Sequence, residues 1–239
     1  MKIIFLILLF LIFNSITVSG IKTFQVLITG FGPFLNYTTN PSELVSQNLS
    51  STCKGFNIEG YEPFQVCYEG WVVDVNETGV QKVQKYLEQN GTKWDAIIHL
   101  GLDDPALELH IELIGANIKA SASRSSFDPI VVGGPNIIPS SFNLRQFNIR
   151  DLSSLSKVFD QQNEIFSRDA GTYFCNEIYY RTLYVVHETP ILIQNGFLPV
   201  LFIHLTDFLI FNLAQDIRMV TEISGYLIAT SYLPYEPNF

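Results

Sequence analysis

Short apolar runs of strand length recur along the chain. Residues 24–29 (FQVLIT), 64–70 (FQVCYEG), 95–101 (DAIIHLG) and 197–204 (FLPVLFIH) each predict a strand, because they are mainly apolar and end at turn-forming or polar residues. Apolar and polar residues alternate well enough over 107–118 (LELHIELIGANI) to predict another strand. The most apolar of these runs are typical of strands that are covered on both faces.

Segments with helical spacing lie between several of these runs. Residues 42–50 and 79–91 predict short helices, residues 143–159 are helical in part, and residues 210–228 predict a long terminal helix. Residues 119–142 are rich in glycine and proline and are expected to form a loop. This alternation of strands and helices predicts an α/β fold, a sheet with helices on both faces, in one domain.

The first 20 residues resemble a signal peptide. One lysine precedes an apolar run over 3–13, and small residues follow up to Gly20, where cleavage is expected. A membrane anchor is the alternative, but the run is short for a membrane span. We therefore expect residues 1–20 to be a signal peptide, residues 21–239 to be the domain, and the product to be secreted or lysosomal.

Composition and charge exclude some classes of binding partner. An apolar content of 47% argues against disorder, and a formal net charge of −9 without a Lys or Arg run argues against nucleic acid. The segment 197–214 is apolar, but Pro199, His204 and Asp207 argue against a second membrane span, so no membrane contact is expected after signal cleavage. A homo-oligomer is compatible with the sequence. Four N-glycosylation sequons follow the leader, at Asn36, Asn48, Asn76 and Asn90.

The three cysteines divide into a pair and a single residue. Cys53 and Cys67 are close enough in sequence to bridge neighbouring segments, which leaves Cys175 over. Cys175 follows an Asp-Ala-Gly turn and a potential helix cap at Thr172, so it is expected in the first turn of a helix. Free N–H groups and the helix dipole favour a thiolate there, as for a nucleophile. The alternative is a small buried hydrophobic residue.

A nucleophilic thiol needs a base. His187 is too far along the predicted helix, and His110 lies within a strand. His99 and His204 lie near carboxyl ends of strands, where α/β sheets form sites, and His204 ends the most apolar strand. The alternative for His204 is a core histidine with satisfied hydrogen bonds.

A third group orients the imidazole in such sites. Glu112 lies between isoleucine and leucine in a predicted strand, where a carboxylate needs a partner such as a histidinium. Asp103 and Asp104 are expected to be solvated in a loop. The histidines and cysteines show no metal-ligand spacing, and the glycine loop GFGPF lacks the features of a phosphate cradle, so neither a metal nor another cofactor is expected.

Four segments together resemble the pyroglutamyl-peptidase I family of cysteine peptidases. They are VLITGFGPFLNYTTNPS, IIHLGLDDPALELHIELIGAN, SRDAGTYFCNEIYYRTLY and LFIHL. The resemblance covers most of the mature chain. It implies a three-layer α/β/α sandwich with a central mixed, mostly parallel sheet, and removal of an N-terminal pyroglutamyl residue from peptides.

The resemblance also implies roles for particular residues. Cys175 would be the nucleophile, His204 the base and Glu112 the residue that orients His204. Phe31 and Phe34 of the glycine loop would enclose the lactam ring, with Asn40 matching the loop asparagine; core packing is the alternative for the two phenylalanines.

Two other functions are compatible with the same sequence. One is a non-catalytic secreted glycoprotein that keeps the fold and a lactam-binding slot. The other is a nucleoside- or phosphate-handling enzyme of similar sheet topology. The presence of all three candidate catalytic residues favours the peptidase.

Overall fold

The computed structural model describes residues 20–34, 37–103, 109–121, 126–140, 165–188, 198–207 and 212–235. The strands are β1 (Lys22–Phe31), β2 (Cys53–Phe56), β3 (Phe64–Val73), β4 (Ala96–Leu102), β5 (His110–Glu112), β6 (Ile114–Ala116), β7 (Lys119–Ala120), β8 (Phe127–Asp128), β9 (Ile137–Pro139), β10 (Phe166–Ser167) and β11 (Val200–Leu205). The helices are α1 (Pro41–Leu49), α2 (Glu77–Val80), α3 (Lys82–Asn90), α5 (Phe174–Glu188) and α7 (Leu213–Tyr232).

The main sheet of the described residues is mixed and mostly parallel. Its seven strands lie in the order β10-β5-β11-β4-β1-β3-β2. The four central strands β11, β4, β1 and β3 are parallel to one another, whereas β5 is antiparallel to β11 and β2 is antiparallel to β3. Two small two-stranded sheets, β6-β9 and β7-β8, accompany it. The predicted mixed, mostly parallel sheet is therefore confirmed.

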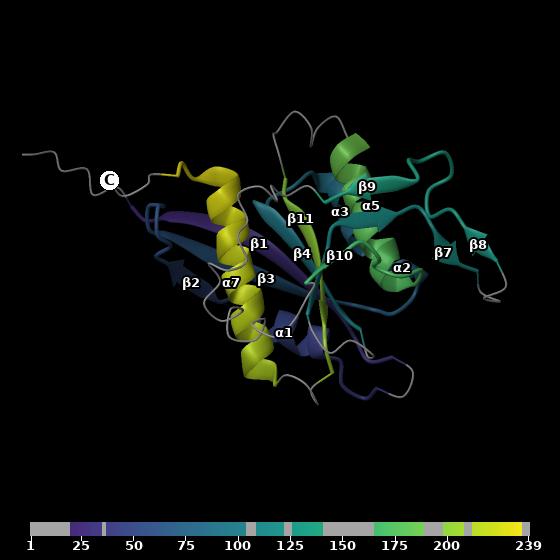
Figure 1. Cartoon of the computed structure of the whole chain (residues 1–239), viewed down its shortest axis with the longest axis horizontal. Helices are drawn as coiled ribbons and strands as arrows, with labels where there is room; N and C mark the ends of the chain where they lie inside the picture. Colours follow the sequence, from purple (N-terminus) through teal and green to yellow (C-terminus); the bar gives the residue numbers. More distant parts are fainter. Residues whose placement is uncertain are drawn as a thin grey trace, which may run out of the picture.

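Helices cover both faces of this sheet, so the predicted three-layer α/β/α sandwich is also confirmed. Figure 1 shows α7 on one side of the sheet and α3 and α5 on the other. Strand β1 shows how the alternation of side chains builds two cores: Val26 and Ile28 belong to the apolar cluster under α1 and α7, while Leu27 belongs to the cluster under α3 and α5. All three side chains are fully buried.

Helix α7 begins at a clear capping signal. The side chain of Asn212 accepts a hydrogen bond from the Gln215 amide, and the Gln215 side chain accepts one from the Asn212 amide. This reciprocal pair satisfies two N–H groups that the helix itself leaves free. The helix therefore starts three residues later than position 210 and continues beyond 228, to Tyr232.

The predicted single strand over 107–118 is wrong. The structure divides the described part of this segment into β5, which joins the main sheet, and β6, which pairs with β9. The expected loop at 119–142 contains the short strands β7, β8 and β9. Such short strands depend on their partners more than on their own sequence, which is why the pattern did not separate them. Residues 1–19 of the predicted leader and the predicted partial helix 143–159 lie outside the described residues.

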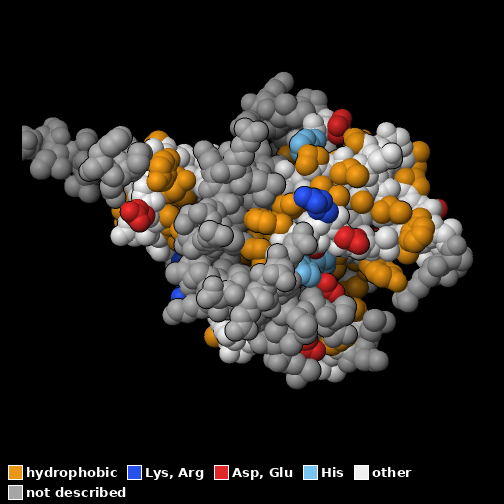
Figure 2. Space-filling model, in the orientation of Figure 1, with side chains coloured by type: hydrophobic (Ala, Val, Ile, Leu, Met, Phe, Trp, Pro, Cys, Tyr) orange, Lys and Arg blue, Asp and Glu red, His pale blue; other side chains and the backbone are white. Residues whose placement is uncertain are grey.

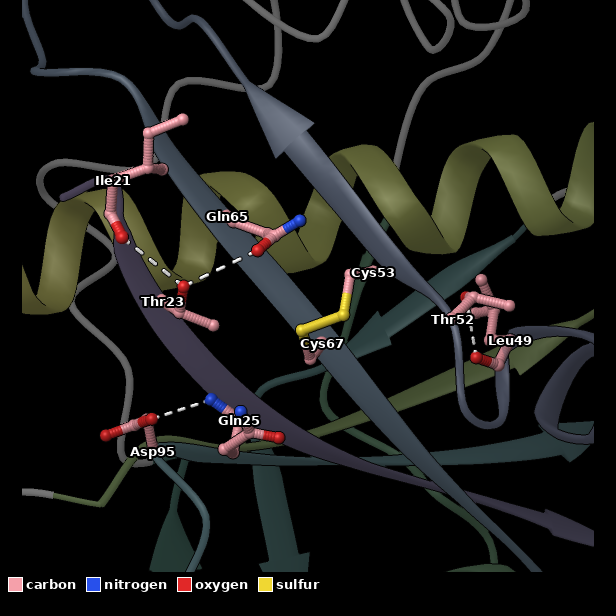
Figure 3. The surroundings of a disulfide bond; sticks show 9 residues. All are labelled: Ile21, Thr23, Gln25, Leu49, Thr52, Cys53, Gln65, Cys67 and Asp95. Atoms are coloured by element: carbon pink, nitrogen blue, oxygen red, sulfur yellow. Dashed lines mark hydrogen bonds between the residues drawn. A yellow bond between two sulfur atoms is a disulfide. The ribbon is translucent and has the colours of Figure 1, made fainter.

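A disulfide joins the edge strand β2 to β3. Cys53 and Cys67 are directly opposed in the antiparallel register and their sulfur atoms are bonded, as Figure 3 shows. Cys53 is exposed and Cys67 is half-buried. The pairing that the sequence left open is thus present, and Cys175 is the free cysteine.

Among the side chains coloured by type in Figure 2, hydrophobic ones gather on the right, the side of β7, β8 and β9. Phe127, Val132 and Ile137 are exposed large hydrophobic side chains of this region. Within the described residues, no helix combines the length and apolar character that a bilayer crossing requires.

Asp216, in the first turn of α7, is fully buried, and neither of its carboxylate oxygens has a hydrogen-bond partner among the described residues. Burial raises the pKa of Asp216 from 3.8 to about 7. A carboxyl whose pKa is raised by folding stabilises the fold fully below its unfolded pKa and loses this contribution as the pH rises through its folded pKa.

Replacing Asp216 with asparagine is therefore expected to raise the free energy of unfolding at pH 8 by about 2–4 kcal/mol. The gain should shrink as the pH falls towards 4, and urea denaturation at several pH values measures it. Asp128→Asn, at an exposed position, is the control and should change stability by less than ~0.5 kcal/mol at every pH. Equal gains at pH 4 and pH 8 would contradict the prediction.

Candidate active site

A cleft of about 810 Å³ opens where the four parallel strands end. Phe31 ends β1, Asp74 follows β3, Leu102 ends β4 and His204 lies near the end of β11. Cys175 enters the same cleft from the start of α5. The carboxyl edge of a parallel sheet is the usual position of a ligand site in open α/β folds. The structure thus brings the candidate nucleophile and the candidate base to one cavity.

Cys175 is the second residue of α5 and lies in its first turn. The turn before it is stabilised by Asp169, whose carboxylate accepts a hydrogen bond from the Gly171 amide at 3.0 Å. Gly171 has φ 79°, a left-handed conformation that glycine adopts without strain. Thr172, the predicted helix cap, lies two residues before the first helical residue, so the prediction of that cap was wrong. Its carbonyl instead accepts a hydrogen bond from the Ala120 amide.

His204 is held by Glu112 from the neighbouring strand. The Nδ1 atom of His204 lies 2.8 Å from Oε1 of Glu112, and both side chains are buried. In the antiparallel register Glu112 faces Phe202, and directly opposed residues project on the same face of a sheet. Since Phe202 and His204 are two residues apart on β11, all three side chains project towards α5.

The electrostatics of His204 favour its charged form. Burial alone would lower the pKa of His204, but hydrogen bonds with Cys175 and Glu112 and the charges of both residues raise it well above its ordinary value. His204 is thus held by a carboxylate and shares the cleft with Cys175, an arrangement in which an imidazole can take a proton from a thiol. The second oxygen of Glu112 has no hydrogen-bond partner among the described residues.

His99, the other histidine near a strand end, is a core residue. It is fully buried between two threonine hydroxyls, with Thr29 at 2.8 Å from Nδ1 and Thr182 at 3.0 Å from Nε2. Burial lowers the pKa of His99 to about 3, so its imidazole is neutral. His204 is therefore the histidine that the cleft offers as a base.

The family model for pyroglutamyl peptidase matches residues 24–215. The chain belongs to the pyroglutamyl peptidase family. It is a cysteine-type peptidase. The chain is 28% identical to the pyrrolidone-carboxylate peptidase of Coprothermobacter proteolyticus over 185 residues, which cover 75% of this chain and 82% of that protein. It is 30% identical to that of Halalkalibacterium halodurans over 168 residues, which cover 68% and 76% of the two chains.

A solved structure shows the same fold. The pyrrolidone carboxyl peptidase from Thermococcus litoralis superposes with a TM-score of 0.65 at 20% identity, over 86% of this chain and 93% of that chain. At this identity the likeness concerns the architecture.

The candidate lactam-binding residues of this pyroglutamyl peptidase all line the cleft. Phe31 is buried and also packs in the core cluster under α5, whereas Phe34 is half-buried and stacks on Tyr37. Asn40 is buried and caps α1. Its Nδ2 donates to the Gly32 carbonyl and its Oδ1 accepts from the Ser42 amide and hydroxyl. Asn40 therefore fixes the glycine loop to α1, and its amide is already engaged there.

Other lining residues of the pyroglutamyl peptidase give its cleft an acidic character. Asp74, Asp103 and Asp169 line it, and no Lys or Arg does so among the described residues. Nor do the described residues contain a group of three or more His, Cys, Asp or Glu side chains that could hold a metal ion.

Gly101 was not singled out from the sequence, although it determines where Cys175 can lie. A Cβ atom added to Gly101 would stand 2.9 Å from Sγ of Cys175 and 2.8 Å from a ring carbon of Phe202. The sulfur thus packs against the backbone of β4, next to His204, which faces Gly101 in the register. A glycine inside an apolar strand is the available signal for such a close approach.

Replacing Gly101 with alanine is expected to lower the stability by about 1–3 kcal/mol, because the added methyl group must displace Cys175 or Phe202. It should also lower kcat, because the sulfur moves away from its aligned position. Thermal unfolding and kcat on a pyroglutamyl amide measure both effects. Gly55→Ala is the control, since no described residue beyond its two chain neighbours has an atom within 4 Å of the added Cβ. Unchanged kcat in Gly101→Ala would contradict the prediction.

Tyr179, also not foreseen, connects α5 to Glu112. It lies one helical turn after Cys175 and is fully buried, and its hydroxyl donates a hydrogen bond of 2.9 Å to the backbone carbonyl of Glu112. Burial raises the pKa of Tyr179, so the hydroxyl stays protonated as a donor. One helix therefore positions both Cys175 and the strand that carries Glu112.

Replacing Tyr179 with phenylalanine is expected to lower kcat about 3- to 10-fold with little change in KM, because Glu112 loses a positioning contact. Tyr180→Phe is the matched control: its hydroxyl donates to the Pro135 carbonyl at 2.6 Å, away from Glu112. Both variants should lose about 1 kcal/mol of stability, and Tyr179→Phe alone should lose kcat. Equal kcat values would assign Tyr179 a structural role only.

Proposed function

We propose that this chain is a cysteine exopeptidase that removes an N-terminal pyroglutamyl residue from peptides, with Cys175, His204 and Glu112 as its catalytic triad. One observation carries the proposal. His204 is hydrogen-bonded to Glu112 and lines the cleft together with Cys175, which contributes to raising the pKa of His204. The family of the chain supplies the substrate class.

In the proposed reaction the thiolate of Cys175 attacks the pyroglutamyl carbonyl carbon. The backbone N–H groups that the first turn of α5 leaves free would donate hydrogen bonds to the oxyanion. The C–N bond then breaks, His204 donates the proton that it took from the thiol to the leaving amine, and a thioester remains. Water, deprotonated by His204, attacks the thioester, and the thiol leaves with the proton restored. Glu112 stabilises the imidazolium in both halves of the cycle.

The lactam ring fits the chemistry of the cleft. It is uncharged, so an apolar slot with few hydrogen bonds can select it, and Phe31 and Phe34 supply apolar surface beside Cys175. The three lining aspartates disfavour the alternative of a phosphate-handling enzyme, because carboxylates repel a phosphate.

We further propose that the protein acts in the secretory pathway, as a secreted or lysosomal enzyme. The signal-like leader supports this location, and so does the Cys53–Cys67 disulfide between the edge strand β2 and β3, since such bonds persist in oxidising compartments.

The test compares two aminocoumarin amides, one pyroglutamyl and one prolyl, whose rings differ in the lactam oxygen and therefore also in the charge of the ring nitrogen. We expect kcat/KM for the pyroglutamyl amide to be at least about 100-fold higher, and iodoacetamide to abolish the release. Binding of the pyroglutamyl compound without release would favour the non-catalytic glycoprotein. Equal release from both amides would contradict pyroglutamyl specificity.

A further inference from the structure

The sequons that the structure describes are all accessible. Asn48 lies in the last turn of α1, Asn76 precedes α2 and Asn90 ends α3, and all three side chains are exposed. Asn36 lies outside the described residues. Exposure is required because a glycan attached to a side chain must project into solvent.

Asn76 differs from the other two because it lines the cleft. Its Oδ1 accepts a hydrogen bond from the Gly79 amide at 2.9 Å and thereby caps α2. An N-linked glycan is attached to Nδ2, so the cap and the glycan use different atoms of the same amide. Thr78, the hydroxyl residue of this sequon, is also exposed. The folded structure can therefore hold a glycan at Asn76 without losing the start of α2.

We propose that Asn76 carries an N-linked glycan, and that this glycan forms part of the wall of the cleft and selects substrates by size. Short pyroglutamyl peptides reach Cys175 beside it, whereas folded proteins that begin with pyroglutamate are hindered. The site itself rests on the exposed sequon and on the disulfide, which marks an oxidising compartment. The size selection rests in addition on the proposed peptidase function.

The modification is a glycosyl transfer from a lipid-pyrophosphate-linked oligosaccharide. The bond from Nδ2 to the anomeric carbon of the first sugar forms, and the bond from that carbon to the pyrophosphate oxygen breaks. The amide proton passes to a base of the transferase, and the lipid pyrophosphate leaves. A branched, hydrated glycan is much larger than the side chain that it replaces, so it reduces the free approach to the cleft from the side of β3 and α2.

Site occupancy is tested first. The full chain is produced in a eukaryotic secretory cell line, and its glycans are removed enzymatically in heavy-oxygen water, which converts each occupied asparagine to a labelled aspartate. Peptide mass spectrometry is expected to find the label at position 76 in the secreted protein. An unlabelled Asn76 overturns the proposal, whatever the occupancy of Asn48 and Asn90.

Size selection is tested with Thr78→Ala, which destroys the sequon but leaves the Asn76 cap intact. Two substrates are compared: a pyroglutamyl aminocoumarin amide and a small folded protein with a cyclised N-terminal glutamine. For the glycosylated enzyme we compare kcat/KM on the folded-protein substrate with kcat/KM on the amide. Thr78→Ala is expected to raise the ratio of the first value to the second about fivefold. An unchanged ratio overturns the size selection.

Two controls separate the glycan from other effects. Asn90→Gln removes a sequon outside the cleft lining and should leave the ratio unchanged. The same Thr78→Ala change in protein produced without glycans in bacteria should also have no effect, and an equal effect there would overturn the proposal. Absence of turnover of the amide would overturn the peptidase function, and size selection with it, whereas the mass measurement decides the modification independently.

Discussion

Replacing Cys175 with alanine is expected to lower kcat/KM on a pyroglutamyl amide at least about 10⁴-fold, because the variant lacks the atom that would form the thioester. Cys175 is only half-buried and lies at the start of α5, so the fold should remain. Steady-state kinetics measures the loss, and binding of a pyroglutamyl peptide to the variant shows that the cleft is intact.

A second variant, Cys175→Ser, tests whether the chemistry of the sulfur itself is required. Cys175→Ser keeps a nucleophilic atom in nearly the same place, but the hydroxyl is much harder to ionise than the thiol. It should therefore retain binding and remain severely impaired. Substantial turnover by Cys175→Ala would disprove the proposed mechanism.

Replacing Glu112 with glutamine is expected to lower kcat about 10²- to 10⁴-fold, the range seen when the residue that orients a catalytic histidine loses its charge. The amide keeps the size of the side chain but no longer stabilises the imidazolium of His204. The Glu112 carboxylate is one of the groups that raise the pKa of His204, so its loss lowers that pKa. His204 then loses its proton at a lower pH, and the alkaline limb of the pH–kcat/KM profile should move to lower pH.

The control for this change is Glu222→Gln, which removes a carboxylate paired with Arg218 on the outer face of α7. It should leave both kcat and the pH profile unchanged. Circular dichroism of Glu112→Gln verifies the fold, because the residue is buried. An unshifted alkaline limb with normal kcat would remove Glu112 from the mechanism.

The sequence predicted those parts of the molecule that depend on local pattern. The apolar runs at 24–29 and 95–101 became the central strands β1 and β4, because a strand covered on both faces must be apolar throughout. Cys175 and His204 were selected by their places at a helix start and a strand end. Glu112 was selected because a carboxylate among apolar residues requires a partner. In the structure Glu112 is hydrogen-bonded to His204, and His204 and Cys175 line the same cleft.

The sequence did not predict features that depend on tertiary pairing. The antiparallel placement of β5 sets Glu112 opposite Phe202, yet β5 has three residues and no pattern of its own. The close packing of Cys175 on Gly101 arises between segments that are far apart in sequence. The contact of Tyr179 with Glu112 is likewise a meeting of two distant segments. Asn40, a residue of the glycine loop, caps α1, so its side chain stabilises the conformation of the loop itself.

The two edge strands of the main sheet determine whether strands of separate molecules can pair. One border is β10, which has two residues, and the other is β2, which has four residues, an exposed lysine at position 54 and a covalent bond to β3. Within the part of the chain that the structure describes, neither border offers a long free ladder of backbone groups with which another strand can pair. Pairing of a second molecule's strand with either of these two borders should therefore be limited to a few backbone hydrogen bonds.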